Sequence, residues 1–475
     1  MSVPGIRIEP MNAAPVRADG KFVLYWMIAS RRTTYNFALE RAAEIARELS
    51  RPLLVLEALR CDYPWASDRI HACILRGMEE NAARCKASGV GYFAYVEPQK
   101  GAGKGLLEAL AKNACAVVTD DFPGFFLPNM VAAAARKLNV KLEAVDSNGL
   151  LPLKAADQEF PTAFAFRRFL QKELPVHLPC MPAADPLRGV SGIAPEISRV
   201  WAPEAPPNLS TLPIDHTVAP VVLPSPKNVL ARFIGEKLAR YGERDEPEED
   251  VTSGLSPHLH FGHISAHEIF LAVAEREKWQ NPGPRADGKR EGWWGMSPEA
   301  EAFLDQLVTW RELGFNTCSQ REDYADFASL PDWAVRTLER HARDPREHAY
   351  KLEEFAAART HDPLWNAAQN QLGREGRIHN QLRMLWGKKI LEWTASPREA
   401  LSVMVELNNR FALDGRDPNS YAGIFWCLGR YDRPWGPERP IFGTVRYMSS
   451  ENTARKHKVT EYVRRYGGAC PTASS

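Results

Sequence analysis

Short apolar runs alternate with longer amphipathic segments over roughly the first third of the chain. Short apolar runs are typical of strands buried on both faces, and apolar positions recurring every three or four residues are typical of amphipathic helices. The predicted strands lie at residues 22–27, 53–56, 91–96, 116–119 and 142–145. The predicted helices lie at residues 35–49, 70–88, 105–113 and 129–138. Strands that alternate with helices predict a doubly wound, parallel α/β sheet.

Prolines crowd the next part of the chain, among them Pro206, Pro207 and Pro213. Because proline removes a backbone donor and restricts the residue before it, this stretch is predicted to be a long linker. A helical periodicity at residues 162–174 interrupts it.

The remainder of the chain has helix-like periodicity and no strand-like alternation of any length. Ser396 with Glu399 forms a capping box with Pro397 at the first helical position, and Ser265 with Glu268 forms another. The expected parts, in chain order, are an α/β domain at 20–150, a proline-rich linker at 151–225 and an all-helical domain at 226–466.

One predicted helix, at residues 379–393, carries an unusual stripe along one face. The stripe consists of His379, Arg383, Trp386, Ile390 and Trp393. A buried cation needs a partner or a ligand, and indoles in series suit redox chemistry as well as packing. A packing helix with an arginine at its rim is the alternative interpretation.

Composition sets limits on these interpretations. A chain of 475 residues is too long for one ordinary core, so two or three domains are expected. The net charge of +1 means that any nucleic-acid affinity must come from a local patch. No apolar run is long enough to span a membrane. Residues 1–10 lack a basic segment followed by an apolar one, and the eight cysteines have no metal or disulfide spacing. We therefore expect a cytoplasmic monomer without a metal or a membrane partner.

Thr252, Ser253 and Ser256 place three hydroxyls in a turn that leads into a helix at Pro257. Hydroxyls and free amides at a helix start can bind phosphate, and a capped helix without a ligand is the alternative. The nearby histidines lack acidic or cysteine partners at metal-binding spacing, so a role other than metal binding is predicted. They are His258, His260, His263 and His267.

Two further segments combine groups that could bind a flat ring. Gln306 and Trp310 share a helix face, where an indole could stack on a ring and the amide could bind its edge. A partly buried amphipathic helix is the alternative. Residues 408–418 resemble a helix end followed by turn residues. In a functional interpretation, Asp414 pairs with Arg383 and presents charge to a cofactor ring.

Positive charge gathers toward the end of the chain. Residues 415–466 hold ten Lys or Arg and five Asp or Glu, an excess of five positive charges. Trp426, Tyr431, Trp435 and Tyr447 interleave with these cations. Basic residues between aromatic ones suit backbone phosphates and unstacked bases, so nucleic acid is favoured over a merely solvated basic face.

Taken together, these segments resemble the photolyase/cryptochrome flavoprotein family, and most closely the class II cyclobutane pyrimidine dimer photolyases. The resemblance covers the whole order of parts and is strongest at residues 362–366, 383–386, 413–418 and 442–448. It implies an N-terminal α/β domain, a linker and a helical FAD domain. It also implies light-driven repair of damaged DNA.

The resemblance further implies a role for each matched residue. Thr252, Ser253, Leu255 and Ser256 would hold the FAD pyrophosphate, and Tyr241, Arg311 and Asp417 would line the cofactor. Arg383 and Asp414 would pair beside the isoalloxazine, with Asn408 facing its N5. Trp386, Trp365 and Trp393 would carry electrons to the flavin. Gln306, Trp310, Met384 and Trp426 would line the lesion pocket, and Arg433, Trp435 and Arg446 would contact DNA.

Two departures from the family pattern keep other functions in view. Members of the family usually carry Glu at the position of Gln306, and an amide can donate a hydrogen bond but cannot supply a proton. Residues 119–126 also differ from the sequence that is usual in class II photolyases. A second, antenna chromophore of unspecified identity is left open. The alternatives are a cryptochrome-like photoreceptor, a photolyase for a different lesion, and a light-independent nucleic-acid-binding protein without FAD.

Overall fold

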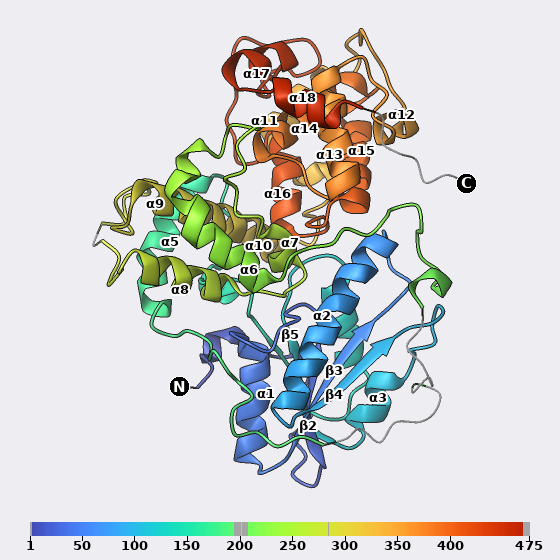
Figure 1. The fold of residues 1–475 in the computed structure, drawn as a ribbon, viewed down its shortest axis with the longest axis vertical. Helices are drawn as coiled ribbons and strands as arrows, with labels where there is room; N and C mark the ends of the chain where they lie inside the picture. Colours follow the sequence, from blue (N-terminus) through green and yellow to red (C-terminus); the bar gives the residue numbers. More distant parts are fainter. Residues whose placement is uncertain (1, 194–200, 202–207, 284, 469–475) are drawn as a thin grey trace. The chain divides into compact units, whose positions relative to one another are not determined.

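The computed structural model describes residues 2–193, 201, 208–283 and 285–468. Two compact units are formed from interleaved segments of the chain (Figure 1). Unit 1 comprises Met1–Asp157, Glu173–Asn228 and Leu255–Glu275. Unit 2 comprises Gln158–Lys172, Val229–Gly254 and Arg276–Ser475. The domain boundaries expected from the sequence remain predictions, since each unit draws on several segments.

Unit 1 is built on a six-stranded sheet with the order β1-β6-β5-β2-β3-β4. The strands are β1 (Ile8–Pro10), β2 (Phe22–Met27), β3 (Leu53–Leu59), β4 (Gly91–Val96), β5 (Ala114–Asp120) and β6 (Leu142–Val145). Leu24 of β2 pairs with Leu54 on one side and with Val117 on the other, both in parallel. Only β1 runs antiparallel, against β6.

Helices cover both faces of this sheet. They are α1 (Phe37–Glu48), α2 (Asp68–Ala87), α3 (Leu106–Ala111) and α4 (Leu127–Ala135). Alternate residues of β2 point to opposite faces, so Tyr25 packs with α1 while Leu24 packs with α3 and α4. The predicted doubly wound α/β architecture is thereby confirmed, and every strand predicted from an apolar run is present. The short antiparallel β1 was not predicted.

Four helices occur in the segments where the chain passes from one unit to the other. They are α5 (Ala163–His177), α6 (Pro226–Arg232), α7 (Ser256–His260) and α8 (Ala266–Arg276). The helical piece expected within the linker is therefore present as α5. At the start of α8, the Ser265 hydroxyl accepts the N–H of His267 at 3.1 Å, so Ser265 caps the predicted helix through His267 and not through Glu268.

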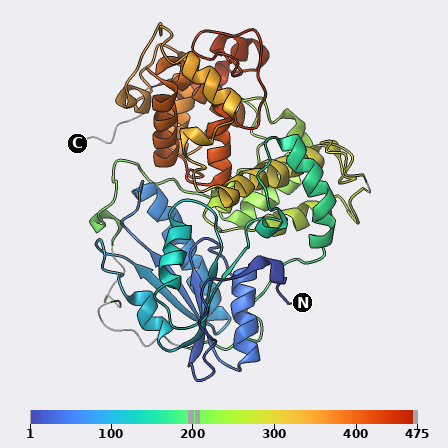
Figure 2. The same ribbon diagram turned by 180° about the vertical axis from the view of Figure 1, so that it is seen from behind.

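The described part of unit 2 is helical apart from loops (Figure 2). Its main helices are α9 (Pro298–Leu304), α10 (Arg311–Gln320), α11 (Asp332–Arg340), α12 (Leu352–Ala356), α13 (Pro363–Glu375), α14 (Asn380–Trp393), α15 (Pro397–Phe411), α16 (Pro418–Cys427), α17 (Ser450–Lys456) and α18 (Thr460–Tyr466). The core lies among α13, α14, α15 and α16 and includes Trp365, Leu382, Met404 and Phe425.

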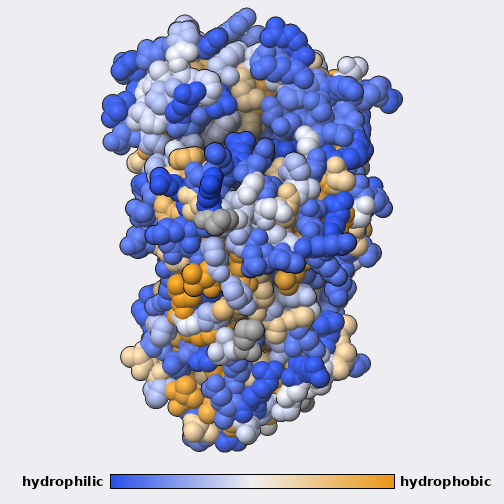
Figure 3. Space-filling view, turned by 90° about the vertical axis from the view of Figure 1, so that its left-hand side faces the viewer, coloured by the Kyte–Doolittle hydropathy of each residue, from blue (hydrophilic) through white to orange (hydrophobic). Residues whose placement is uncertain are grey.

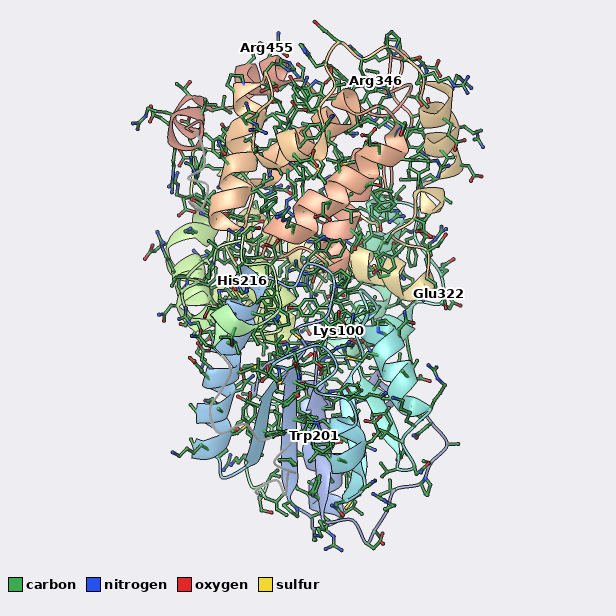
Figure 4. All side chains as sticks on the ribbon, turned by 90° about the vertical axis from the view of Figure 1, so that its right-hand side faces the viewer. Lys100, Trp201, His216, Glu322, Arg346 and Arg455 are labelled. Carbon is green, nitrogen blue, oxygen red and sulfur yellow. The ribbon has the colours of Figure 1, made fainter. Side chains whose placement is uncertain are left out.

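Local hydrogen bonds fix the starts and ends of these helices. The Ser396 hydroxyl accepts the N–H of Glu399 at 3.2 Å, and the Glu399 carboxylate accepts the N–H of Ala395 at 3.0 Å. The predicted capping box at the start of α15 is therefore confirmed. At the end of α14, Arg346 donates to the carbonyl of Thr394 at 2.9 Å (Figure 4).

The face drawn in Figure 3 is mostly hydrophilic, with small and scattered apolar areas. Within the described ranges, no helix combines the length and the apolar character needed to cross a bilayer. The seven cysteines in those ranges are free thiols.

Candidate functional site

Three indoles lie in series in the core of unit 2. Trp386 and Trp393 are on α14, and Trp365 is on α13; each is at most 2% exposed. The indole N–H of Trp365 donates to the backbone carbonyl of Trp386 at 3.0 Å. The rings of Trp365 and Trp393 are 5.9 Å apart, edge to face. The helix predicted at 379–393 is present, and the structure brings the three predicted tryptophans together.

Neighbouring polar side chains fix both ends of this series. The Trp386 indole N–H donates to Oε1 of Gln369 on α13 at 2.9 Å. At the other end, the Trp393 ring lies 5.7 Å from Tyr350 and 4.9 Å from His361. The hydroxyl of Tyr350 is 2.7 Å from Nδ1 of His361, which is exposed. The series therefore runs from a buried amide to the surface of unit 2.

Arg383, in the first turn of α14, contacts the end of α15 and the turn that follows it. Its Nη2 lies 3.3 Å from Oδ1 and 3.5 Å from Oδ2 of Asp414. Its Nη1 lies 3.5 Å from Oδ1 of Asn408. The predicted Arg383–Asp414 ion pair is present, with side chains 17% and 16% exposed. Both side chains of the pair are therefore only partly buried, one helical turn before the buried Trp386.

Asn408 and Asp417 are held by the junction of α15 and α16. The Asn408 amide donates to the hydroxyl of Ser420 at 2.8 Å. The Asp417 carboxylate accepts the N–H of Asn419 at 2.9 Å and so caps α16. Both residues are nearly buried. Asn408 is therefore held next to Arg383, whereas the capping hydrogen bond of Asp417 is structural.

The other residues expected to bind FAD are distributed over both units. In unit 2, Tyr241 is buried against Phe233 and Phe303, with ring separations of 5.9 and 5.4 Å. Arg311, at the start of α10, is 7% exposed and lies over the ring of Phe315.

The hydroxyl-rich turn crosses the boundary between the units along the chain. Thr252 and Ser253 belong to unit 2, and Leu255 and Ser256 belong to unit 1. Ser256 is exposed and begins the five-residue helix α7, with Pro257 in its first turn. The predicted helix start is confirmed. The phosphate-binding role of the turn remains a prediction.

Gln306 and Trp310 occupy a π-helical turn, Asp305–Trp310, between α9 and α10. Both are half-buried, whereas Asp305, Leu307, Val308 and Thr309 between and beside them are buried. The predicted shared face is therefore present. The sequence predicted an ordinary helix; the π-helical turn, a feature frequent at functional sites, was not foreseen.

Trp426, near the end of α16, lies beside α14 through several contacts. The thiol of Cys427 is 3.8 Å from the carbonyl of Met384. The ammonium of Lys388 donates to the carbonyl of Cys427 at 2.7 Å and lies 5.1 Å from the Trp426 ring centre. Met384 and Trp426, both predicted to line a lesion pocket, thus come from two helices in contact.

The three residues expected to contact DNA meet at one carboxylate that the sequence did not single out. Arg446 donates to Asp432 through Nε at 3.0 Å and Nη2 at 3.1 Å. The Trp435 indole N–H donates to the same carboxylate at 3.1 Å, and the backbone N–H of Arg433 does so at 2.9 Å. Partial burial raises the pKa of Asp432, but the hydrogen bonds from Arg446, Arg433 and Trp435 outweigh this effect and the net pKa is lowered. The carboxylate is therefore ionised at neutral pH.

Lys388 is the other charged residue that sequence analysis missed. It is 0% exposed, and burial lowers the pKa of its ammonium to about 8. Its position in the helical periodicity does not distinguish Lys388 from exposed lysines on other helices. An acidic residue within an otherwise basic and aromatic segment was the available signal for Asp432.

No metal cluster accompanies these groups: the described residues hold no set of three or more His, Cys, Asp or Glu side chains able to bind an ion. Within unit 1, the buried histidines His258 and His263 have ring centres 6.2 Å apart. Burial lowers the pKa of His258 to about 4 and that of His263 to about 3.

Comparison with known proteins shows relatives over almost the full length. No protein-family model matches the chain. The chain is 34% identical over 468 residues to the deoxyribodipyrimidine photo-lyase of Methanothermobacter thermautotrophicus, covering 97% of this chain and 98% of that protein. It is 34% identical over 460 residues to the deoxyribodipyrimidine photo-lyase of Potorous tridactylus, covering 94% and 81%.

Solved structures have a similar fold at lower sequence identity. A class III photolyase from Agrobacterium tumefaciens aligns with a TM-score of 0.68 and 17% identity, covering 94% of this chain and 86% of that one. An archaeal photolyase from Sulfolobus tokodaii, solved with two FAD molecules, aligns with a TM-score of 0.67 and 14% identity, covering 94% and 89%. The fold is therefore shared across distant sequences.

Proposed function

The chain belongs to the deoxyribodipyrimidine photo-lyase family, and from this premise we propose that it is a light-driven DNA repair lyase that splits cyclobutane pyrimidine dimers. The observation that carries the proposal is the position of α14. One helix places Arg383 in a partly exposed ion pair with Asp414, and one turn later Trp386 begins the indole series that ends beside Tyr350. A partly exposed cation and a buried series of indoles leading away from it suit a redox-active ring.

The polar groups around Arg383 fit the isoalloxazine ring of FAD. The hydrogen bonds of Arg383 to Asn408 and Asp414 are long, at 3.3 to 3.5 Å, and its side chain keeps 17% of its surface exposed. Such a cation can shorten its contacts to a polar ring edge without losing its carboxylate partner. Asn408 supplies an amide at the same place. Arg383, Asp414 and Asn408 would therefore hold the ring, and Tyr241, Thr252, Ser253 and Arg311 would hold the rest of the molecule.

The chain contributes positioning, electron transfer and exclusion of water. When bound and reduced, FAD would supply the light-driven electron donation that opens the dimer. Trp386, Trp365 and Trp393 conduct an electron inward from the surface when the cofactor is oxidised. Gln369 and the carbonyl of Trp386 fix the two inner rings through hydrogen bonds. These hydrogen bonds keep the spacing of the rings fixed, so the path for the electron stays the same.

A dimer inside a duplex cannot reach a buried ring, so the protein must extrude it, at a cost of a few kcal/mol or less for a damaged pair. Trp310 and Trp426 offer indole faces on which the extruded bases can stack. The Gln306 amide can donate a hydrogen bond to a pyrimidine carbonyl. Arg433, Trp435 and Arg446 would contact the DNA around the extruded pair.

A cryptochrome-like photoreceptor is the second candidate, and Gln306 is the residue that favours it. Without a carboxylic acid at this position the lesion pocket lacks a proton donor, and a protein could keep the light chemistry while losing repair. A second, light-harvesting chromophore in unit 1 fits either candidate. The absorption spectrum of the purified protein tests both for flavin and for such a chromophore.

The deciding experiment is repair of an oligonucleotide that contains one thymine dimer. The purified protein is chemically reduced, mixed with the oligonucleotide and exposed to blue light, with a dark sample as control. Light-dependent recovery of thymine absorbance is expected. A Gln306→Glu variant run in parallel measures what the amide costs. No repair by a yellow, photoreducible wild-type protein, with recovery in Gln306→Glu, would favour the photoreceptor.

A further inference from the structure

Three cations and two indoles form a connected cluster at the end of α16, with Lys388 buried on α14 and the other members on α16 and the loops that follow it. We call it the cation–indole ladder, and its members are Lys388, Trp426, Arg446, Trp435 and Arg433. The Lys388 ammonium is 5.1 Å and the Arg446 guanidinium 5.3 Å from the Trp426 ring centre. Arg446 is also 4.1 Å from the Trp435 ring centre, and Arg433 is 4.8 Å from it. Arg446 is thus shared between two rings.

One carboxylate sets the geometry of this ladder. Asp432 accepts four hydrogen bonds, two from Arg446, one from the Trp435 indole and one from the backbone N–H of Arg433. Its side chain is 8% exposed, whereas that of Arg446 is 38% exposed. The two bonds from one guanidinium fix its plane as well as its position. A single acidic side chain therefore orients one cation and one indole while remaining largely shielded itself.

Asp432 has two opposite effects on DNA binding. Its charge weakens the attraction to phosphates, whereas its hydrogen bonds position Arg446 and Trp435. DNA backbones attract cations without regard to sequence or damage, and this attraction provides most non-specific affinity. A carboxylate beside Arg446 weakens that attraction, which is a disadvantage for binding alone. Specific recognition instead requires that rings and donors be held where unstacked bases can meet them. A buried acid within a DNA-binding surface makes sense if discrimination is what it improves.

We propose that Asp432 is a positioning residue that determines lesion specificity: it holds Arg446 against Trp426 and Trp435, so that the ladder favours DNA with an extruded pair over intact duplex. This inference rests on the proposed function. Asp432 acts through Arg446 and Trp435 and does not itself touch the substrate. The ionised carboxylate reduces affinity for intact duplex, and the oriented rings compensate only when unstacked bases are present.

The test compares binding of two duplexes that differ only by one thymine dimer, in the dark, at two salt concentrations. The full-length proteins with bound cofactor are the wild type, Asp432→Asn, Asp432→Glu, Arg446→Ala and the double variant Asp432→Asn/Arg446→Ala. Asp432→Asn keeps the shape but removes the charge and one acceptor. Asp432→Glu keeps the charge but moves it. Thermal midpoints are recorded for each variant.

Asp432→Asn is expected to bind intact duplex more tightly, with a steeper salt dependence, and to lose about tenfold in discrimination between the two duplexes. Asp432→Glu is expected to lose discrimination without gaining affinity for intact duplex. In the Arg446→Ala background, Asp432→Asn should leave discrimination unchanged, because the partner through which it acts is gone.

Glu339→Gln is the matched control. Glu339 pairs with Arg398 at 2.8 Å, and Arg398 lies 4.5 Å from the ring centre of Phe327, so this change also removes an acid from a cation on a ring. It should not change discrimination. Equal tightening of both duplexes by Asp432→Asn, or unchanged binding, would overturn the inference. A wild type that binds both duplexes equally would overturn the proposed function together with it, an outcome distinguishable because no variant is needed to see it.

Discussion

At the scale of single residues, the charge that is hardest to account for is the ammonium of Lys388. It has no exposed surface, and it donates a hydrogen bond to the carbonyl of Cys427. Burying an ion costs free energy that one neutral acceptor repays only in part. Its ammonium lies 5.1 Å from the ring centre of Trp426, so the buried cation also helps to hold this indole in place.

Lys388→Met tests the cost directly through its pH dependence. Burial lowers the pKa of Lys388 to about 8, below the ordinary 10.5, so the unfolded chain binds more protons between these two values. The cost is therefore present at pH 7 and disappears as the pH rises toward 10.5. Relative to Lys388→Met, the wild-type free energy of unfolding should increase by about 2 kcal/mol from pH 7 to pH 10. Denaturant unfolding at both values measures this.

Lys389→Met provides the control, since its neighbour Glu392 forms an ion pair at 2.8 Å. Burial lowers the pKa of Lys389, but the hydrogen bond and charge of Glu392 outweigh it and the net pKa is raised. Its contribution should therefore stay constant over the same pH interval. A flat difference between wild type and Lys388→Met would contradict the buried, easily deprotonated lysine.

A second residue-scale prediction concerns Trp386. Replacing it by Phe removes both the inner ring of the series and the donor to Gln369. Photoreduction of the oxidised cofactor should then be blocked, whereas repair by chemically reduced protein should persist, because that reaction needs no electron from the series. Absorbance under blue light follows the first and the dimer oligonucleotide the second.

The control for this variant is Trp293→Phe, which alters a buried indole 4.6 Å from Trp294 and outside the series. It should photoreduce like the wild type. Normal photoreduction in Trp386→Phe would remove this residue from the electron path.

At the scale of elements, glycine allows α2 and the segment after α7 to approach closely within unit 1. A β-carbon added to Gly77 would lie 2.3 Å from Nε2 of His263, which is far inside contact distance. Gly77→Ala should therefore lower the free energy of unfolding by about 1 to 3 kcal/mol. The loss should shrink when His263→Ala is added, and thermal unfolding measures both.

Gly235→Ala is the comparison, because no atom lies within 4 Å of the added β-carbon there. It should be neutral or slightly stabilising, since alanine favours helix more than glycine does. If Gly77→Ala is equally neutral, the close approach of these two elements is wrong.

Local patterns predicted most elements, because an apolar run or a helical stripe is a property of consecutive residues. They predicted β2 and β4 at their observed bounds and the helix that carries Trp386. They missed β1, whose three residues carry too short a pattern, and the π-helical turn at Gln306, which leaves the spacing of apolar residues almost unchanged. Whether a segment forms a helix or a strand depends mostly on its local sequence, but an irregularity such as the π-helical turn is determined by packing.

The residues of the candidate site also divide into those that local patterns predict and those that only the folded packing brings together. Arg383, Asp414 and Asn408 could be predicted as a group because several ordered motifs carry them, and the structure brings them together. Asp432 could not be predicted, since its importance comes from a loop that brings Arg446 and Trp435 to one carboxylate. A contact made by irregular backbone leaves no periodic pattern in the sequence.

At the scale of the whole molecule, charge is local rather than global. The net charge is +1, while residues 415–466 carry an excess of five positive charges. Long-range attraction to DNA should therefore be weak, and binding should depend on the few cations that reach phosphates. Salt dependence then reports individual residues rather than the average charge of the protein.

Arg446→Ala should make this visible. Removing the guanidinium takes away one cation and leaves the Asp432 carboxylate without its bidentate partner beside the DNA. Binding to a dimer-containing duplex should weaken by about tenfold, and the slope of log affinity against log salt should fall by about 1. Arg455→Ala, on α17, removes a cation that donates to Asn452 and lies outside the ladder, so it serves as the control (Figure 4). Because both variants change the net charge equally, a difference between them can only come from where the charge lies; equal effects would mean that the DNA-binding surface is not organised around Arg446.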